Sequence, residues 1–172
     1  FVSNSLAAAA VGNVCRLPLG KIKLGLENFT WPDHRMKPVR LKSGALVIDD
    51  SYNSNPSAVR EALKTFNQLA GRRRKIIVLG DMLELGQYED SFHREIGRLV
   101  ASSNPDYLFG VGVAAKAIIQ EASKTMKSQQ LFWVQTYKEV FSKLQPLLKK
   151  DVIVLIKGSR FIALDKVVSQ LS

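Results

Sequence analysis

The stretch A-L-V-I-D-D-S-Y-N-S-N-P (residues 45–56) joins an apolar segment to a turn rich in hydrogen-bonding groups. Its first residues are typical of a buried strand, and its last residue begins a predicted helix at residues 56–70. In an open α/β sheet, ligands bind at the carboxyl ends of the strands. Turn and helix-cap preferences account for one or two of these polar residues, but not for so many at one strand end. We therefore expect a binding site here.

Strands and helices alternate along the rest of the chain. We predict strands at residues 75–79, 107–111, 131–134 and 152–156. Further helices are expected at residues 91–101, 113–124, 136–149 and 163–171. Residues 37–41 and 45–49 flank Lys42-Ser43-Gly44, which predicts a β-hairpin. Short connections and continuous apolar strands favour a Rossmann-like, three-layer α/β/α domain with a mostly parallel sheet.

The N-terminal part has a different pattern. Residues 1–14 and 17–29 are predicted helices, and Trp31-Pro32 biases the segment 30–37 away from helix. The chain begins without a methionine or a capping residue, so we expect a fragment of a longer protein. We divide it into residues 1–36, a helical tail with a linker, and residues 37–172, the α/β domain.

Composition excludes several classes of protein. The 172 residues are 46% hydrophobic and 23% charged, as in ordinary globular domains. No apolar run approaches the ~20 residues that span a bilayer. Cys15 is the single cysteine, which excludes an intrachain disulfide and a cysteine metal cage and fits a reducing cytoplasm.

The net charge of +10 allows nucleic acid, an anionic membrane surface or phosphorylated small molecules as partners. The densest basic run is R-R-R-K at residues 72–75, without interleaved aromatic residues that would stack on bases. A solvated loop explains this run better than a nucleic-acid patch. We expect a monomer that binds neither nucleic acid nor membranes.

Glycine or polar residues end four predicted strands: D-D-S-Y-N, G-D-M, G-V-G and K-G-S-R. G-V-G lacks the rest of the dinucleotide fingerprint. The sequence contains no G-x-x-x-x-G-K-[ST] loop to hold ATP phosphates, so the chain is not a complete P-loop ligase. His34 is expected at the surface and His93 in a structural role, and no metal site is predicted.

Three of these segments carry a family resemblance. D-D-S-Y-N-S-N-P (49–56), L-G-D-M-L-E-L-G (79–86) and K-G-S-R (157–160) occur in the order typical of the C-terminal domain of Mur ligases. S-N-S-L-A-A-A-A (3–10) resembles half of a helix motif at the end of their central ATP-binding domain. The resemblance covers nearly the whole chain. It implies that residues 1–36 are the last helices of the central domain and its linker.

The resemblance also implies an activity for the intact enzyme, in the branch that adds D-alanyl-D-alanine during peptidoglycan synthesis. Such a ligase uses ATP and Mg²⁺ to phosphorylate the carboxylate of UDP-MurNAc-tripeptide, and the dipeptide amine attacks the acyl phosphate. The central domain supplies the P-loop and the metal ligands, and it and the N-terminal domain are the expected partners from the same chain. We therefore expect no catalytic residue here, no turnover by the fragment alone, and a bacterial cytoplasmic location.

The resemblance assigns nucleotide-binding roles to six residues: Asn4, Arg35, Asp50, Tyr52, Asn53 and Asn55. Asn4 matches a residue at the adenine edge, Arg35 a linker arginine at the phosphates, and Asp50 the carboxylate at the ribose. Helix capping is the alternative for Asn4 and Asn55. Strand alternation directs Asp49 away from Asp50, so we expect it to be structural.

Substrate-binding roles are expected for Lys157, Ser159, Arg160 and Asp81. The two cations suit a carboxylate of the dipeptide or of the nucleotide-linked peptide. The alternatives are a helix cap for Ser159 and loop hydrogen bonding for Asp81.

Three other functions compete with this one. A Mur ligase that adds a diamino acid ends the corresponding strand in a histidine-containing sequence, where this chain has Y-N-S-N-P. A stand-alone flavodoxin-like binding module needs no missing domain. A nucleic-acid-binding domain rests on the +10 charge alone.

Overall fold

The computed structural model describes residues 2–172 and divides into two compact units, Phe1–Pro32 and Asp33–Ser172. The first unit consists of α1 (Val2–Val14) and α2 (Leu19–Glu27), which pack where Gly12 faces Ile22. Both helices were predicted, although Phe1 lies outside the described residues. Helix α1 begins before Asn4, so Asn4 does not cap it. The assignment of residues 1–36 to another domain stays a prediction.

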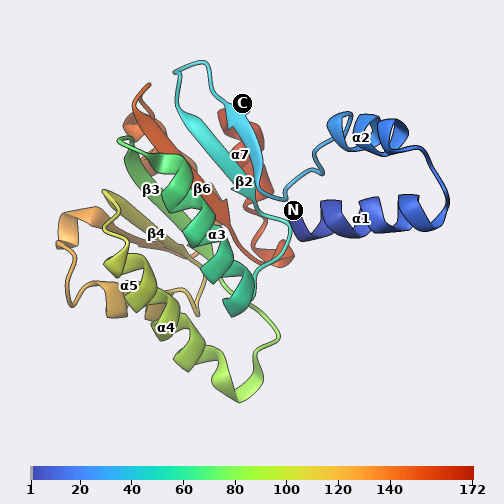
Figure 1. The fold of residues 1–172 in the computed structure, drawn as a ribbon. Coiled ribbons are helices and arrows are strands. Elements are labelled where there is room, and N and C mark those ends of the chain that lie inside the picture. The colour runs from blue at the N-terminus through green and yellow to red at the C-terminus, as the bar shows by residue number, and fades with distance from the viewer. Residues whose placement is uncertain (1) are drawn as a thin grey trace. The chain divides into compact units, whose positions relative to one another are not determined.

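The second unit is built on a six-stranded sheet in the order β1-β2-β6-β3-β4-β5 (Figure 1). The strands are β1 (Lys37–Arg40), β2 (Leu46–Asp50), β3 (Arg74–Gly80), β4 (Tyr107–Val111), β5 (Leu131–Val134) and β6 (Val152–Lys157). Only β1 runs antiparallel, and it forms the predicted hairpin with β2. The mostly parallel sheet is confirmed.

Helices cover both faces of the sheet, which confirms the three-layer α/β/α class (Figure 1). They are α3 (Pro56–Ala70), α4 (Glu89–Ser102), α5 (Lys116–Ala122), α6 (Tyr137–Leu144) and α7 (Asp165–Leu171). Short 3₁₀ segments are η1 (Gly86–Tyr88), η2 (Ser128–Gln130), η3 (Gln145–Leu147) and η4 (Arg160–Ile162). No helix within residues 2–172 has the length and apolar character needed to cross a membrane.

Strand alternation builds the two cores. On one face, Ile153 and Leu155 of β6 pack with α3, α4 and α5. On the other, Val154 and Ile156 pack with α6 and α7. Every residue of β6 is buried. Because full burial of a Val, Ile or Leu side chain contributes about 1.5–3 kcal/mol, this last strand is a major source of stability.

Some predicted helices end differently. The helix predicted at residues 113–124 is shorter in the structure and spans Lys116–Ala122. The helix predicted at residues 136–149 ends at Leu144 and is followed by the 3₁₀ turn η3, which contains Pro146. Proline has no N–H for a helical hydrogen bond, which is a physical reason for the second change. Leu99, an apolar residue of α4, is 36% exposed.

Helix α3 begins at an amide cap, as the alternative role of Asn55 predicted. Asn55 Oδ1 accepts a hydrogen bond from Ala58 N at 2.8 Å, and Pro56 occupies the first helical position. Asn55→Ala should lower the free energy of unfolding by about 1 kcal/mol, measured by urea denaturation. Asn55→Asp keeps the acceptor and should be near neutral. Equal losses for both variants would contradict the capping role.

Candidate functional site

Strands β2 and β6 bring two predicted site residues together at their carboxyl ends. Asp50 and Lys157 are partners in the strand register. Lys157 Nζ donates to Asp50 Oδ2 at 2.7 Å and to the carbonyl oxygen of Asn53 at 2.8 Å. The lysine side chain is 3% exposed and the aspartate side chain 14%. This ion pair joins the D-D-S-Y-N turn to K-G-S-R, so both segments lie on one edge of the sheet.

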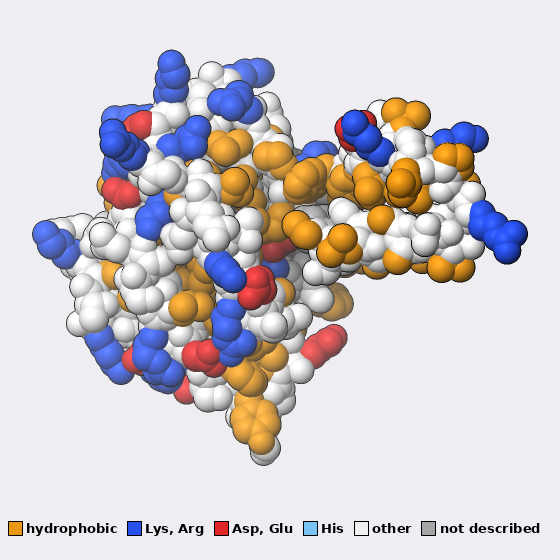
Figure 2. Space-filling view, viewed as in Figure 1, with side chains coloured by type: hydrophobic (Ala, Val, Ile, Leu, Met, Phe, Trp, Pro, Cys, Tyr) orange, Lys and Arg blue, Asp and Glu red, His pale blue; other side chains and the backbone are white. Residues whose placement is uncertain are grey.

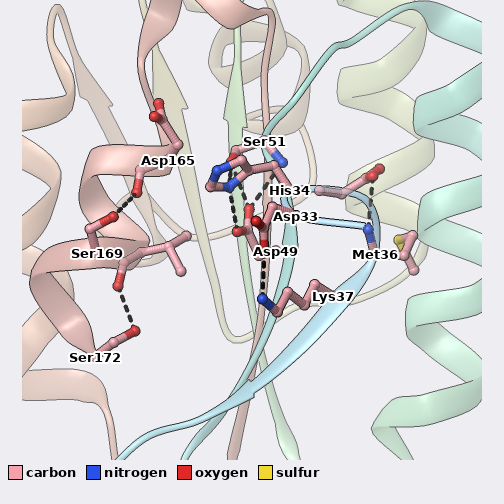
Figure 3. A network of polar contacts seen from close by, with 11 residues as sticks. Asp33, His34, Met36, Lys37, Asp49, Ser51, Asp165, Ser169 and Ser172 are labelled. Atoms are coloured by element: carbon pink, nitrogen blue, oxygen red, sulfur yellow. Dashed lines mark hydrogen bonds and ion pairs between the residues drawn. The ribbon is translucent and has the colours of Figure 1, made fainter. Parts of the chain in front are cut away.

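The neighbouring Asp49 points the other way and is structural, as expected. Its Oδ1 accepts hydrogen bonds from Ser51 Oγ at 2.6 Å and from Ser51 N at 3.1 Å. Its Oδ2 lies 2.8 Å from His34 Nδ1 (Figure 3). The His34 side chain is 28% exposed. His34 thus keeps part of its side chain at the surface, as expected, while the ring contacts a buried carboxylate, a partner that the sequence did not indicate.

The linker segment Asp33–Met36 is held against the same turn (Figure 3). Tyr52 N donates to the His34 carbonyl oxygen at 3.0 Å, and Met36 N donates to Asp50 Oδ1 at 3.1 Å. His34 and Met36 have φ values of 59° and 53°, in the left-handed region. The linker backbone thus adopts the shape that lets it contact Asp50.

Two guanidinium groups lie near the Tyr52 ring. Arg35 Cζ lies 4.2 Å from the ring centroid, and Arg160 Cζ lies 5.6 Å from it. Both distances are typical of cation–π contacts. Tyr52 is 42% exposed and both arginines are exposed. Three predicted site residues, one from the linker and two from strand ends, therefore form one solvent-facing group.

Other predicted residues shape the backbone of this edge. Ser159 Oγ accepts a hydrogen bond from Leu83 N at 3.0 Å and makes no cap bond to η4, so the helix-cap alternative is wrong. Asp81 Oδ1 accepts from Ala115 N at 2.7 Å, and Asp81 N donates to the Val111 carbonyl oxygen at 3.1 Å. Asp81 therefore links the ends of β3 and β4, as its loop-bonding alternative predicted.

His93 supports the same region from helix α4. It is fully buried, and its Nε2 accepts a hydrogen bond from Met82 N at 3.0 Å, while Nδ1 lies 2.7 Å from the Glu89 carbonyl oxygen. The expected structural role is confirmed. Sequence reasoning missed Phe161, which follows Arg160 and is 88% exposed. Nothing in the local pattern distinguishes Phe161 from Ile162, which is partly buried, or from Leu164, which is buried.

The Asp50 carboxylate fits a ligand hydroxyl. Each of its oxygens accepts one hydrogen bond described above, and a carboxylate oxygen accepts two. The side chain also keeps some exposure to solvent. Residues 2–172 contain no group of three or more His, Cys, Asp and Glu side chains that would hold a metal ion. The edge therefore suits a hydroxylated or anionic ligand.

Comparison with known families agrees with this geometry. The model of the family described as Mur ligase, glutamate ligase domain, matches residues 34–160, which include every element of the edge described above. The chain belongs to this family. The resemblance on three short motifs is thereby confirmed over most of the chain.

Similar curated proteins carry one name, UDP-N-acetylmuramoyl-tripeptide–D-alanyl-D-alanine ligase. One from Buchnera aphidicola is 34% identical over 170 residues, which is 99% of this chain and 36% of that protein. One from Escherichia coli is 31% identical with the same coverage. This chain therefore spans just over a third of the length of these relatives.

Solved structures agree with the sequence comparison. A MurF structure from Acinetobacter baumannii matches 98% of this chain and 36% of its own, with a TM-score of 0.87 and 31% identity. MurF from Thermotoga maritima in complex with ADP matches 86% of this chain and 32% of its own, with a TM-score of 0.68 and 25% identity. MurC from Thermotoga maritima has a TM-score of 0.68 but only 18% identity, so this likeness shows the shared fold alone.

Proposed function

We propose that this chain is the C-terminal part of a ligase that adds D-alanyl-D-alanine to UDP-MurNAc-tripeptide through an acyl phosphate. The observation that carries the proposal is the Asp50–Lys157 pair, which joins two family motifs into one edge. Likeness to relatives of that name over 99% of the chain supports it. Because the sequence has no P-loop, phosphate activation falls to the central domain of the complete enzyme, and we expect the chain alone to be inactive.

On this proposal the nucleotide lies along the turn after β2. Asp50 accepts hydrogen bonds from the ribose. Arg35, which also contacts the Tyr52 ring, binds the phosphates. Asn53, Asn55 and Tyr52 line the same side, and Asn4 reads the adenine edge. Lys157 has both of its described hydrogen bonds inside the protein, so it positions Asp50 and the Asn53 backbone.

Arg160 is the main contact for the incoming dipeptide. Its guanidinium is exposed at the same edge, and a planar guanidinium binds a carboxylate through two parallel hydrogen bonds. Ser159 and Asp81 shape the backbone beneath it, and a direct contact with substrate is a secondary role for them and for Lys157. Closure of the other domains over this edge excludes water from a hydrolysable intermediate.

ATP and Mg²⁺ are the cofactors on this proposal. This chain contributes nucleotide contacts, and the metal ligands come from the other domains, because residues 2–172 hold no suitable cluster. Mg²⁺ bound with ATP neutralises phosphate charge. Helices α1 and α2 are then the end of the central domain, and the enzyme is a cytoplasmic monomer.

Two substitutions in the complete ligase test the site assignment. Asp50→Ala removes the ribose acceptor and should raise KM for ATP about tenfold or more, with little change in KM for the dipeptide. Arg160→Ala should raise KM for the dipeptide, with little change in KM for ATP, because the dipeptide carboxylate loses its charged partner. Steady-state kinetics with each substrate varied in turn measures both effects.

Matched controls lie at the other end of the strands. Asp151→Ala and Arg40→Ala remove the same charges from exposed positions and should leave both KM values unchanged. If Asp50→Ala and Arg160→Ala behave like these controls, the site assignment is wrong. Ligation by the 172-residue chain alone would refute the division of labour between domains.

A further inference from the structure

The amino ends of β2, β3 and β6 form the edge of the sheet opposite the candidate site. These strands are parallel neighbours, so the loops that enter them reach the same edge. The loops are residues 40–45, 71–74 and 149–151. They carry exposed basic side chains, here called the basic rim: Arg40, Lys42, Arg72, Arg73, Lys149 and Lys150.

Backbone contacts place the three loops side by side. Arg74 N donates to the Asp151 carbonyl oxygen at 2.9 Å, which joins the second loop to the third. A Cβ atom at Gly44 would lie 3.0 Å from Lys150 Cγ, so the first loop touches the third as well. Figure 2 shows Lys and Arg side chains gathered over this end of the sheet. The scattered basic residues of the sequence therefore become one surface.

Little negative charge offsets the basic rim. Asp151 is the single acidic residue in the three loops. The nearby Asp106 is engaged by Arg74 Nε at 3.3 Å and by Lys75 N at 2.8 Å. No ion pair within residues 2–172 includes a side chain of the basic rim.

The C-terminus of helix α3 explains only part of this arrangement. Arg73 Nη1 lies 3.5 Å from the Leu69 carbonyl oxygen, and cations are favourable at a helix C-terminus. That role accounts for Arg73 and its neighbour Arg72. It does not account for Lys42, Lys149 or Lys150, which come from other elements. Unpaired cations gathered from separate loops indicate an anionic partner.

We propose that the basic rim docks on the surface of an anionic lipid bilayer. A flat lipid surface requires only that cations share one edge, and each adds to the attraction within a Debye length. Nucleic acid fits less well, because the rim is made of loops and presents no helix or strand side to enter a groove. The exposed aromatic residues of the described chain also lie outside these loops: Phe29, Trp31, Tyr52, Tyr88, Trp133 and Phe161.

The proposal revises the expectation, based on scattered charges, that membranes are not partners. The contact is peripheral and electrostatic, since no helix within residues 2–172 is able to span a bilayer. It leaves the opposite edge, with Asp50 and Arg160, directed away from the lipid. The inference does not depend on the proposed ligase activity.

Vesicle sedimentation tests the proposal with the 172-residue chain. Vesicles of phosphatidylcholine with about one third phosphatidylglycerol should bind the chain at about 50 mM salt and release most of it at about 300 mM. Pure phosphatidylcholine vesicles should not bind it. Binding that ignores salt or lipid charge would overturn the proposal, as would tighter binding to duplex or single-stranded oligonucleotides than to the anionic vesicles.

Charge-matched variants locate the contact. Binding should fall about tenfold or more in a rim variant that combines Arg72→Gln, Arg73→Gln, Lys149→Gln and Lys150→Gln. It should change less than about twofold in a control with equal loss of charge from exposed positions on α2, α3 and α6, which combines Lys21→Gln, Lys64→Gln, Lys138→Gln and Lys143→Gln.

A second rim variant guards against misfolding. Arg72→Lys, Arg73→Lys, Lys149→Arg and Lys150→Arg keep every charge while changing every side chain, and this variant should bind like the original chain. Equal losses in the rim variant and the control would show that net charge alone attracts the chain, and the proposal would fall. Loss of binding in the charge-preserving variant would overturn it as well.

Discussion

Lys157→Met is expected to lower the free energy of unfolding by about 3 kcal/mol. The substitution leaves the Asp50 carboxylate facing an apolar side chain, and it removes the donor to the Asn53 carbonyl oxygen. Breaking a buried ion pair by removing one partner typically costs 3–5 kcal/mol, and the 14% exposure of Asp50 places this case near the lower end. Urea denaturation followed by circular dichroism measures the change.

A double variant separates the pair from the packing. Lys157→Met combined with Asp50→Leu removes both charges and should recover most of the lost stability, because no unpaired carboxylate is left. Lys138→Met, at an exposed position on α6, is the matched control and should change stability by less than about 0.5 kcal/mol. A Lys157→Met variant as stable as this control would show that the pair does not hold the two motifs together.

Gly112→Ala should cost about 3 kcal/mol, because two separate penalties act at this position. Gly112 has a φ of 108°, which side-chain-bearing residues rarely adopt. A Cβ there would lie 2.3 Å from Asp81 Oδ2, so the carboxylate has to move away from Ala115 N, its partner at 2.7 Å. The side-chain part of the link, from Ala115 N to Asp81 Oδ1, is then lost, while the backbone bond from Asp81 N to the Val111 carbonyl oxygen is kept.

Gly71→Ala isolates the backbone penalty. Gly71 also has a positive φ, of 57°, but no heavy atom lies within 4 Å of the Cβ position. Its ψ of −120° lies outside the left-handed helical region, and its substitution should cost about 1–2 kcal/mol, less than Gly112→Ala. Thermal and urea unfolding of the two variants give the difference. If both variants lose the same stability, Asp81 is not constrained by Gly112, and its part in shaping the site edge is smaller than the structure indicates.

These effects bear on function because the same contacts shape the site. Lys157 and Asp81 were expected to meet the substrate, yet each has protein partners at hydrogen-bonding distance. Arg35, Tyr52 and Arg160 are the predicted residues that face solvent together. We therefore expect substitutions in the first group to change stability first, and those in the second group to change kinetics with little effect on stability.

The amino-acid sequence by itself determined the local elements of this protein. Apolar periodicity and glycine or proline at the ends of segments placed all six strands and the helices, because such patterns depend on neighbours a few residues apart. The polar tips of the strands and the three family motifs also pointed to one edge of the sheet, where Asp50 and Lys157 meet. Details such as the Asn55 cap followed from equally local chemistry.

Only the tertiary structure decided which distant residues meet. The last strand, β6, inserts between β2 and β3, and this brings Lys157 to Asp50, 107 positions earlier in the chain. The same insertion brings together the loops of the basic rim. It also places Ser159 beside the loop after β3, where Ser159 N donates to the Asp81 carbonyl oxygen and Ser159 Oγ accepts from Leu83 N. The strand order buries β6 on both faces. The packing energy that favours this order is summed over the whole sheet, so no short stretch of sequence is enough to predict the order.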